Sequence, residues 1–332
     1  MIADSPAQPS KHLQVLDGWR GISILAVLAC HLLPLGPKRL EINEAAGLLG
    51  MSLFFCLSGF LITRFLLQRE NVTDFLIRRS CRILPLAWLA LIPGLLLAHA
   101  SSNRYAPNFL FYANLPPFWL TDVTGHYWSL CVEMQFYAAI ALLFLAGRKH
   151  ALKLLPLTSI AITLLRIHDS QYESIVTYYR IDEILSGATL ALLYSGEFGE
   201  SARRLLTHIN PWIAAVLLLL STHPFFQSMN YGRPYFAAAL VATSLCRPNF
   251  PARRLLISKP LAYVAEISYA LYIVHPILDS TWLGSGDKML KYAKRPLLFI
   301  AIFAVAHLST YQYESHWIAL GKRLGKKLSK PS

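Results

Sequence analysis

The chain has 332 residues, of which 55% are hydrophobic and 15% are charged, and its formal net charge is +13. Soluble domains carry about 25% charged residues, and long apolar runs recur here from end to end, so the composition excludes an ordinary soluble protein and indicates repeated membrane crossings. The positive charge lies in short clusters between the apolar runs, which is typical of residues that set membrane topology and does not indicate a nucleic-acid partner.

Ten apolar segments follow a polar tail. We predict them at about 16–36, 47–67, 83–99, 126–146, 153–168, 177–194, 210–223, 232–246, 261–279 and 295–313. Their apolar runs are continuous rather than alternating, which favours helices over a transmembrane barrel. The expected fold is an all-α integral membrane protein, a bundle of about ten transmembrane helices over residues 16–313. A disordered tail (1–15) would precede the bundle and a basic tail (314–332) would follow it.

The basic residues predict the orientation of the bundle. With ten crossings and a cytoplasmic N-terminus, twenty of the 31 lysines and arginines fall on the cytoplasmic side, eight on the outer side and three inside segments. Cytoplasmic loops of membrane proteins carry the excess of Lys and Arg. Both termini are therefore expected in the cytoplasm.

The first segment opens with Asp17 and Arg20 and ends at His31. In a helix, Arg20 and His31 are separated by about 1100° of rotation, roughly 20° past three turns, and by a rise of about 16 Å. One face would carry a cation near its start and an imidazole deep in the apolar part, and ionisable groups inside a membrane indicate function. A plain first membrane helix, with its Arg at the water line and its His bonded to a carbonyl, explains this pair alone equally well.

A basic cluster, Arg78-Arg79-Ser80-Cys81-Arg82, stands where the third segment begins. Three guanidinium groups within about one turn make a strong site for phosphates. The alternative is an ordinary basic anchor on the cytoplasmic side of a membrane helix.

The fourth segment opens with HYWSLCVEMQFY. Ser129, Glu133 and Tyr137 are spaced four residues apart and share a helix face. A glutamate this far into a membrane helix needs a partner, and we expect Glu133 to lie near the depth of His31, where its carboxylate would orient the imidazole. The alternative is a packing network in which Glu133 bonds Trp128, Tyr137 or backbone.

Two further stretches carry buried polar residues. Arg180 and Asp182 are two residues apart, so they do not face each other on a helix; each needs a partner elsewhere, in an ion pair between helices or in a substrate. His275 precedes Pro276, which kinks or ends a helix, so its imidazole would line a cavity or lie at the membrane interface. The five cysteines form no CxxC pair, so neither a disulfide framework nor a zinc site is predicted.

Taken together, these segments resemble the acyltransferase family 3 membrane proteins, the bacterial O-acyltransferases that modify extracytoplasmic glycans and some small molecules. The resemblance rests on LDGWRGISILAVLACH, FFCLSGFLIT, the Arg79-x-x-Arg82 pair, WSLCVEMQFY and SYALYIVHP, which occur in the family's order along nearly the whole chain. One such motif would be weak, but five in register are specific.

The resemblance implies an enzyme of the bacterial cytoplasmic membrane. It would move an acyl group, usually acetyl, from cytoplasmic acyl-CoA to a hydroxyl of a carbohydrate or similar acceptor on the far side, with no permanently bound cofactor and no metal. In the expected mechanism Arg20, Arg79 and Arg82 bind the phosphates of acyl-CoA. His31 removes the proton of the acceptor hydroxyl or takes the acyl group itself, and Glu133 orients its ring or stabilises its cation. The residues expected to support the site are Asp17, Trp128, Ser129, Tyr137, Arg180, Asp182 and His275.

The alternative function is a polytopic transporter or exporter without acyltransfer activity. Transporters often consist of two related halves, and this sequence shows no such pairing. We therefore favour the acyltransferase.

Overall fold

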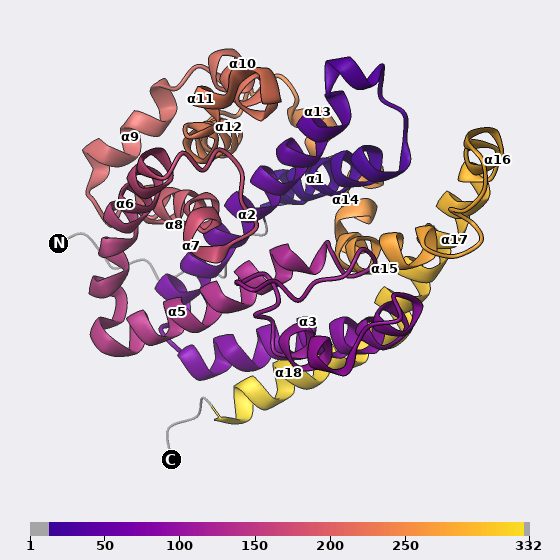
Figure 1. The fold of residues 1–332 in the computed structure, drawn as a ribbon. Coiled ribbons are helices and arrows are strands. Elements are labelled where there is room, and N and C mark those ends of the chain that lie inside the picture. The colour runs from indigo at the N-terminus through magenta and orange to yellow at the C-terminus, as the bar shows by residue number, and fades with distance from the viewer. Residues whose placement is uncertain (1–12, 329–332) are drawn as a thin grey trace.

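The computed structural model describes residues 13–328, which are mostly helical and contain no strand (Figure 1). The helices in chain order are α1 (Gln14–Leu32), α2 (Ile42–Arg69), α3 (Val72–Leu97), α4 (Tyr105–Phe109), α5 (Tyr127–Ala151), α6 (Leu155–His168), α7 (Thr177–Arg180), α8 (Asp182–Tyr194), α9 (Glu200–His208), α10 (Pro211–Thr222), α11 (Gln227–Asn230), α12 (Arg233–Cys246), α13 (Arg253–Leu256), α14 (Lys259–Glu266), α15 (Ser268–Asp279), α16 (Lys288–Ala293), α17 (Arg295–Leu308) and α18 (Ser315–Leu328). A π-helical turn, Ser309–Glu314, joins α17 to α18. Most of the expected tail 1–15 lies outside the described residues, but Gln14 and Val15 already belong to α1.

Every one of the ten predicted segments overlaps a helix, but ten membrane crossings are not confirmed. Within residues 13–328, five helical stretches are long and apolar enough to cross a membrane, or up to seven if each of two sharply bent pairs counts as one span. The bent pairs are α9–α10, at 78°, and α14–α15, at 65°. Helices α8, α10 and α12 have 12 to 14 residues, or about 18–21 Å, which is short of a hydrocarbon core about 30 Å thick.

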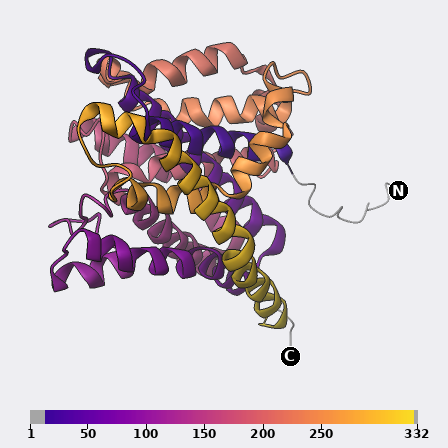
Figure 2. The same ribbon diagram turned by 90° about the vertical axis from the view of Figure 1, so that its right-hand side faces the viewer.

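The long helices run across the bundle between two ends, as Figure 2 shows. We call the end at which α2 turns into α3 the α2–α3 end, and the opposite one, where α1 leads into α2, the α1–α2 end. The first turn of α1 lies at the α2–α3 end, because Leu13 and Asp17 line the same cavity as Arg69 and Arg79. The last helix, α18, also ends there, since Gly325 packs against Asp74 of α3.

The backbones of α2 and α8 come into direct contact. A Cβ atom at Gly59 would lie 1.9 Å from the carbonyl oxygen of Ile184, and one at Gly187 would lie 1.9 Å from that of Cys56. Small residues allow this close approach between membrane helices. The two glycines therefore fix the short helix α8 against the long helix α2.

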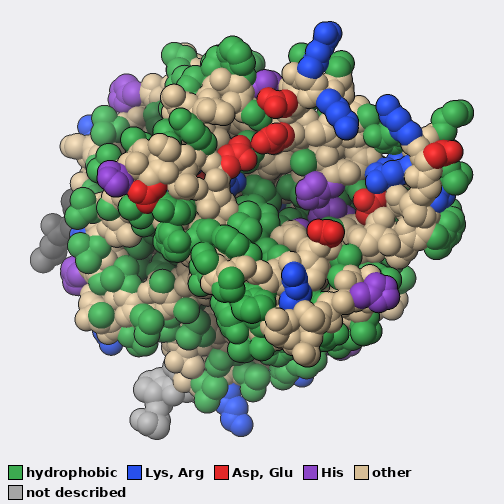
Figure 3. All heavy atoms as spheres, in the orientation of Figure 1, with side chains coloured by type: hydrophobic (Ala, Val, Ile, Leu, Met, Phe, Trp, Pro, Cys, Tyr) green, Lys and Arg blue, Asp and Glu red, His purple; other side chains and the backbone are tan. Residues whose placement is uncertain are grey.

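The apolar core forms two clusters that meet along α1 and α2. The first joins them mainly to α3, α5, α15 and α17, and the second mainly to α10 and α12, while α8 contributes to both. The face drawn in Figure 3 carries many hydrophobic side chains, with histidine side chains near its centre and several acidic and basic side chains around them. The polar groups described below lie where α1, α2, α3, α5 and α15 converge.

Candidate active site

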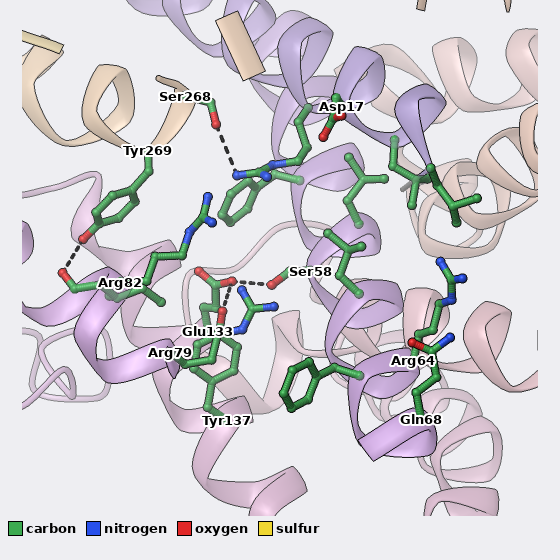
Figure 4. Close-up of a pocket in the computed structure, with 18 of the residues that line it drawn as sticks. Asp17, Ser58, Arg64, Gln68, Arg79, Arg82, Glu133, Tyr137, Ser268 and Tyr269 are labelled. Atoms are coloured by element: carbon green, nitrogen blue, oxygen red, sulfur yellow. Dashed lines mark hydrogen bonds between the residues drawn. The ribbon is translucent and has the colours of Figure 1, made fainter. Parts of the chain in front are cut away.

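A polar cavity of about 350 Å³ opens at the α2–α3 end, between α1, α2, α3, α5 and α15 (Figure 4). The charged side chains that line it are Asp17, Arg20, Arg64, Arg69, Arg79, Arg82 and Glu133. Five guanidinium groups face two carboxylates, so the cavity has an excess of positive charge. Such a cavity suits a ligand with several negative charges.

The first turns of α3 explain why two of these arginines are available to a ligand. Asn71 caps α3 by accepting a hydrogen bond from the backbone N–H of Asp74. The Asp74 carboxylate in turn pairs with Arg78 at 2.5 Å and with Arg69 at 3.2 Å. Arg79 and Arg82, one turn apart, form no ion pair with any described residue. The structure thus places both arginines at the cavity, and their binding of acyl-CoA stays a prediction.

Glu133 lies in this cavity rather than beside His31. Its carboxylate accepts hydrogen bonds from the hydroxyls of Ser58 and Tyr137 and is 6% exposed. The guanidinium of Arg79 lies over the Tyr137 ring, 5.9 Å from its centroid. The expectation that Glu133 orients the His31 ring is therefore wrong. α5 starts at the α1–α2 end, and Glu133 lies about 9 Å along it, too deep to meet the last turn of α1.

His31 is exposed at the α1–α2 end, and its ring partner is His275. The Nδ1 atom of His31 lies 2.8 Å from Nε2 of His275, with the rings stacked at 5.1 Å. The Nδ1 atom of His275 lies 3.1 Å from the carbonyl oxygen of Leu271. A carbonyl oxygen only accepts, so neutral His275 holds its proton on Nδ1 and presents Nε2 as an acceptor.

It follows that His31 donates from Nδ1, and that the lone pair of its neutral ring is on Nε2. None of the described residues forms a hydrogen bond with this Nε2 atom. The side chain therefore ends in a fixed, free base. His275 was expected only in a supporting place, and the structure makes it the group that orients the His31 ring.

Polar groups of α5 and α15 surround the histidine pair. The ring of His126 lies 5.7 Å from that of His275. Tyr272 donates to the backbone oxygen of His126 at 2.6 Å, and its hydroxyl oxygen lies 2.6 Å from the Ser129 hydroxyl. Ser129 thus supports the histidine region, whereas Glu133, one turn on, belongs to the arginine cavity.

A small pocket, which we call the narrow passage, adjoins the arginine cavity on the side towards the histidines, although none of the described histidines lines it. It has a volume of about 20 Å³, close to a single water molecule, and reaches Val27 and Tyr272. Arg20, Phe54 and Ser268 line both the cavity and this passage.

Helix α1 carries Arg20 and His31 on one face, as predicted. Arg20 donates to Ser268 at 3.4 Å and His31 contacts His275, and both partners belong to α15. The two residues therefore share the face of α1 that meets α15. Eleven residues of one continuous helix separate them by about 16 Å.

Arg180, Asp182 and Trp128 lie apart from the cavity, in a buried ionic network. Asp182 pairs with Arg166 at 2.5 Å, and the Arg180 guanidinium lies 5.3 Å from the Trp128 ring centroid. Glu183 pairs with Arg233 at 2.8 Å and with Arg180 at 3.4 Å. As expected, Arg180 and Asp182 find separate partners, which are Glu183 on α8 and Arg166 on α6 respectively. These ion pairs link α8 to α6 and to α12.

Several residues of the site were not predicted from the sequence, among them Ser58, Arg64 and His126. Arg64 carried a usable signal, because an arginine inside an apolar segment is itself unusual. Ser58 and His126 gave none, because each owes its place to contacts with other helices. Among residues 13–328, no group of three His, Cys, Asp or Glu side chains is arranged to hold a metal ion.

Comparison with known proteins gives a consistent picture. The family model described as "Acyltransferase domain" matches residues 13–314. The chain is 27% identical to YrhL of Bacillus subtilis, a candidate peptidoglycan O-acetyltransferase, over 81% of this chain and 49% of the relative. It is 26% identical to the peptidoglycan O-acetyltransferase OatA of Listeria monocytogenes, over 90% of this chain and 54% of the relative. The chain thus spans about half the length of these relatives. No solved structure matches it.

Proposed function

Since the chain belongs to the acyltransferase domain family, we propose that it is a membrane O-acyltransferase. It moves an acyl group, most simply acetyl, from acyl-CoA to a hydroxyl of an extracytoplasmic glycan or similar acceptor. One observation carries this proposal. A single face of α1 joins a cavity rich in arginine to a histidine whose Nε2 lone pair is free.

The donor enters at the α2–α3 end. Guanidinium groups bind phosphate oxygens through paired, charge-assisted hydrogen bonds, so Arg20, Arg79 and Arg82 hold the diphosphate of acyl-CoA. The thin pantetheine arm then follows α1 through the narrow passage towards His31. Because that passage holds about one water molecule, the side chains of Phe54 and Tyr272 must move aside when the donor binds.

The reaction takes place at His31. Its Nε2 atom removes the proton from the acceptor hydroxyl, whose oxygen attacks the thioester carbonyl. The C–S bond breaks, and the CoA thiolate takes up the proton from the imidazolium. His275 is a positioning residue, because its Nε2 holds the His31 proton on Nδ1. In the other possible order, Nε2 takes the acyl group first and passes it to the acceptor; an acyl-histidine burst in rapid-quench experiments would identify that order.

The α2–α3 end is proposed to face the cytoplasm. Arg69, Arg78, Arg79 and Arg82 lie there, and an excess of basic residues marks the cytoplasmic side of membrane proteins. Acyl-CoA then enters from the cytoplasm, while the exposed side of His31 meets an acceptor outside. The relatives' names as peptidoglycan O-acetyltransferases favour a glycan of the cell wall as acceptor, and the bacterial cytoplasmic membrane is the corresponding location.

The decisive experiment uses the full chain in lipid nanodiscs with labelled acetyl-CoA and cell-wall glycan fragments. We expect acceptor-dependent release of free CoA and label in the glycan. His31→Ala should reduce the rate by about 100- to 10,000-fold, the usual contribution of a positioned base. His316→Ala, an exposed histidine of α18, is the matched control and should leave it unchanged. Near-normal turnover in His31→Ala would remove His31 from the mechanism, and transport without release of CoA would favour the transporter.

A further inference from the structure

The last helix, α18, lies beyond the residues that match the family, which end at 314. It runs along α3, and two glycines allow the close approach. A Cβ atom at Gly321 would lie 2.8 Å from Cβ of Cys81, and one at Gly325 would lie 2.0 Å from Oδ1 of Asp74. Lys322, next to the first of these glycines, is thereby placed at the basic turn of α3.

A second cavity lies at this contact, with a volume of about 150 Å³. Its lining residues are Phe65, Phe75, Arg78, Arg79, Arg82, Ile318 and Lys322. Four of them are cationic, and none of the described residues that line the cavity is acidic. Asp74 neutralises Arg78, whereas Arg79, Arg82 and Lys322 form no ion pair with any described residue. The cavity therefore carries positive charge without a matching anion.

The small cavity continues the large one. Phe65, Arg79 and Arg82 line both cavities, so the two meet at these three side chains. A molecule that carries two phosphate groups close together could place one in each. The nucleotide end of CoA has this form, with a diphosphate at the 5′ position and a phosphate monoester at the 3′ position of one ribose.

We propose that α18 completes a site for the 3′-phosphate of CoA, in which Lys322, beyond the residues that match the family model, supplies a further positive charge. The proposal rests on the proposed function, because it assumes a CoA donor. The phosphate dianion lies between Lys322 and the guanidinium groups of Arg79 and Arg82, and the diphosphate occupies the large cavity. The same charges would suit the phosphate of an anionic lipid headgroup, so the experiment must separate these two sources.

The test compares CoA with 3′-dephospho-CoA by calorimetry, with the full chain in phosphatidylcholine nanodiscs. The unaltered chain should bind CoA at least about tenfold more tightly, since charge-assisted bonds to a dianion are lost with the 3′-phosphate. Lys322→Gln should weaken CoA about fivefold to tenfold and leave 3′-dephospho-CoA unchanged. Lys322→Arg should restore the preference, and the matched control Arg323→Gln, on the next residue of α18, should leave both affinities as they are.

Other results of these experiments would contradict the proposals. Equal affinity for the two ligands, or equal weakening of both in Lys322→Gln, would overturn the 3′-phosphate assignment while leaving the donor proposal intact. In native mass spectrometry, a bound lipid headgroup would show as phosphatidylglycerol that the unaltered chain retains and Lys322→Gln does not. If the preference for CoA over 3′-dephospho-CoA stayed the same in that variant, the cavity would be assigned to a lipid headgroup and the 3′-phosphate assignment would be overturned. Failure of the unaltered chain to bind CoA at all would instead contradict the proposed function.

Discussion

The contact between His31 and His275 yields the sharpest prediction. In His275→Gln, the amide oxygen reaches about as far as the Nε2 atom and can still accept the Nδ1–H of His31. In His275→Asn, the shorter amide replaces only the Nδ1 side of the ring and leaves His31 without its acceptor. The two variants have similar polarity and differ mainly in which ring nitrogen they imitate.

The size of the effect follows from the geometry. The His31–His275 hydrogen bond is 2.8 Å long, and His275 is fully buried. Leaving a donor at this site without a partner costs about 1–3 kcal/mol, or about 5- to 150-fold in rate. We expect His275→Asn to lower kcat by this factor with the KM for acetyl-CoA unchanged, because the donor site is about 16 Å away along α1. His275→Gln should stay within a few-fold of the unaltered chain.

The assay is steady-state release of CoA by the full chain in nanodiscs, with acetyl-CoA and acceptor varied separately. Binding of CoA by calorimetry serves as the folding control for both variants. The reasoning would be refuted if the two variants had equal kcat, or if either one raised the KM for acetyl-CoA as much as it lowered kcat.

Three other substitutions test separate parts of the structure. Gly187→Ala forces a Cβ atom to 1.9 Å from a backbone oxygen of α2 and should lower the free energy of unfolding in mixed micelles by at least about 1–3 kcal/mol. The control is Gly94→Ala, where the nearest atom would be 3.4 Å from the new Cβ. Equal effects of the two substitutions would contradict the packing argument. Arg79→Ala combined with Arg82→Ala should weaken acetyl-CoA binding by about 100-fold or more, because charge-assisted phosphate contacts are lost, and should leave the KM for the acceptor unchanged. Equal weakening of acetyl-CoA binding and of acceptor binding would instead indicate misfolding. Glu133→Gln should leave the pH dependence of kcat unchanged, because the carboxylate does not touch the His31 ring. The variant should also lower the free energy of unfolding by about 1–2 kcal/mol. A shifted pH profile would restore a direct link to His31.

Local pattern predicted the helices and one face of the site well. All ten apolar segments are helical, and the spacing of Arg20 and His31 does place them on one face of α1, because helix geometry alone determines that relation. The number of crossings was harder to predict, since α8, α10 and α12 are apolar enough but too short, and bends at the α9–α10 and α14–α15 junctions depend on packing.

Partners from distant parts of the chain could not be predicted in this way. His31 and His275 are 244 positions apart, and Ser58 and Glu133 are 75 apart. A carboxylate readily accepts a hydrogen bond from an imidazole, so the sequence favoured a Glu133–His31 pair. The depth of each residue along its own helix decided otherwise, and that depth depends on how α2, α5 and α15 pack.

The constriction between Arg20 and the histidine pair also matters for the cell that holds this protein. Ionisable groups line both ends of the path, and a continuous file of water between them would let protons leak across the membrane and drain its electrochemical gradient. The constriction has room for about one water molecule, which is too little for such a continuous file. In the proposed mechanism, the pantetheine arm that opens the constriction also fills it, so the bound donor would itself block the path during each turnover.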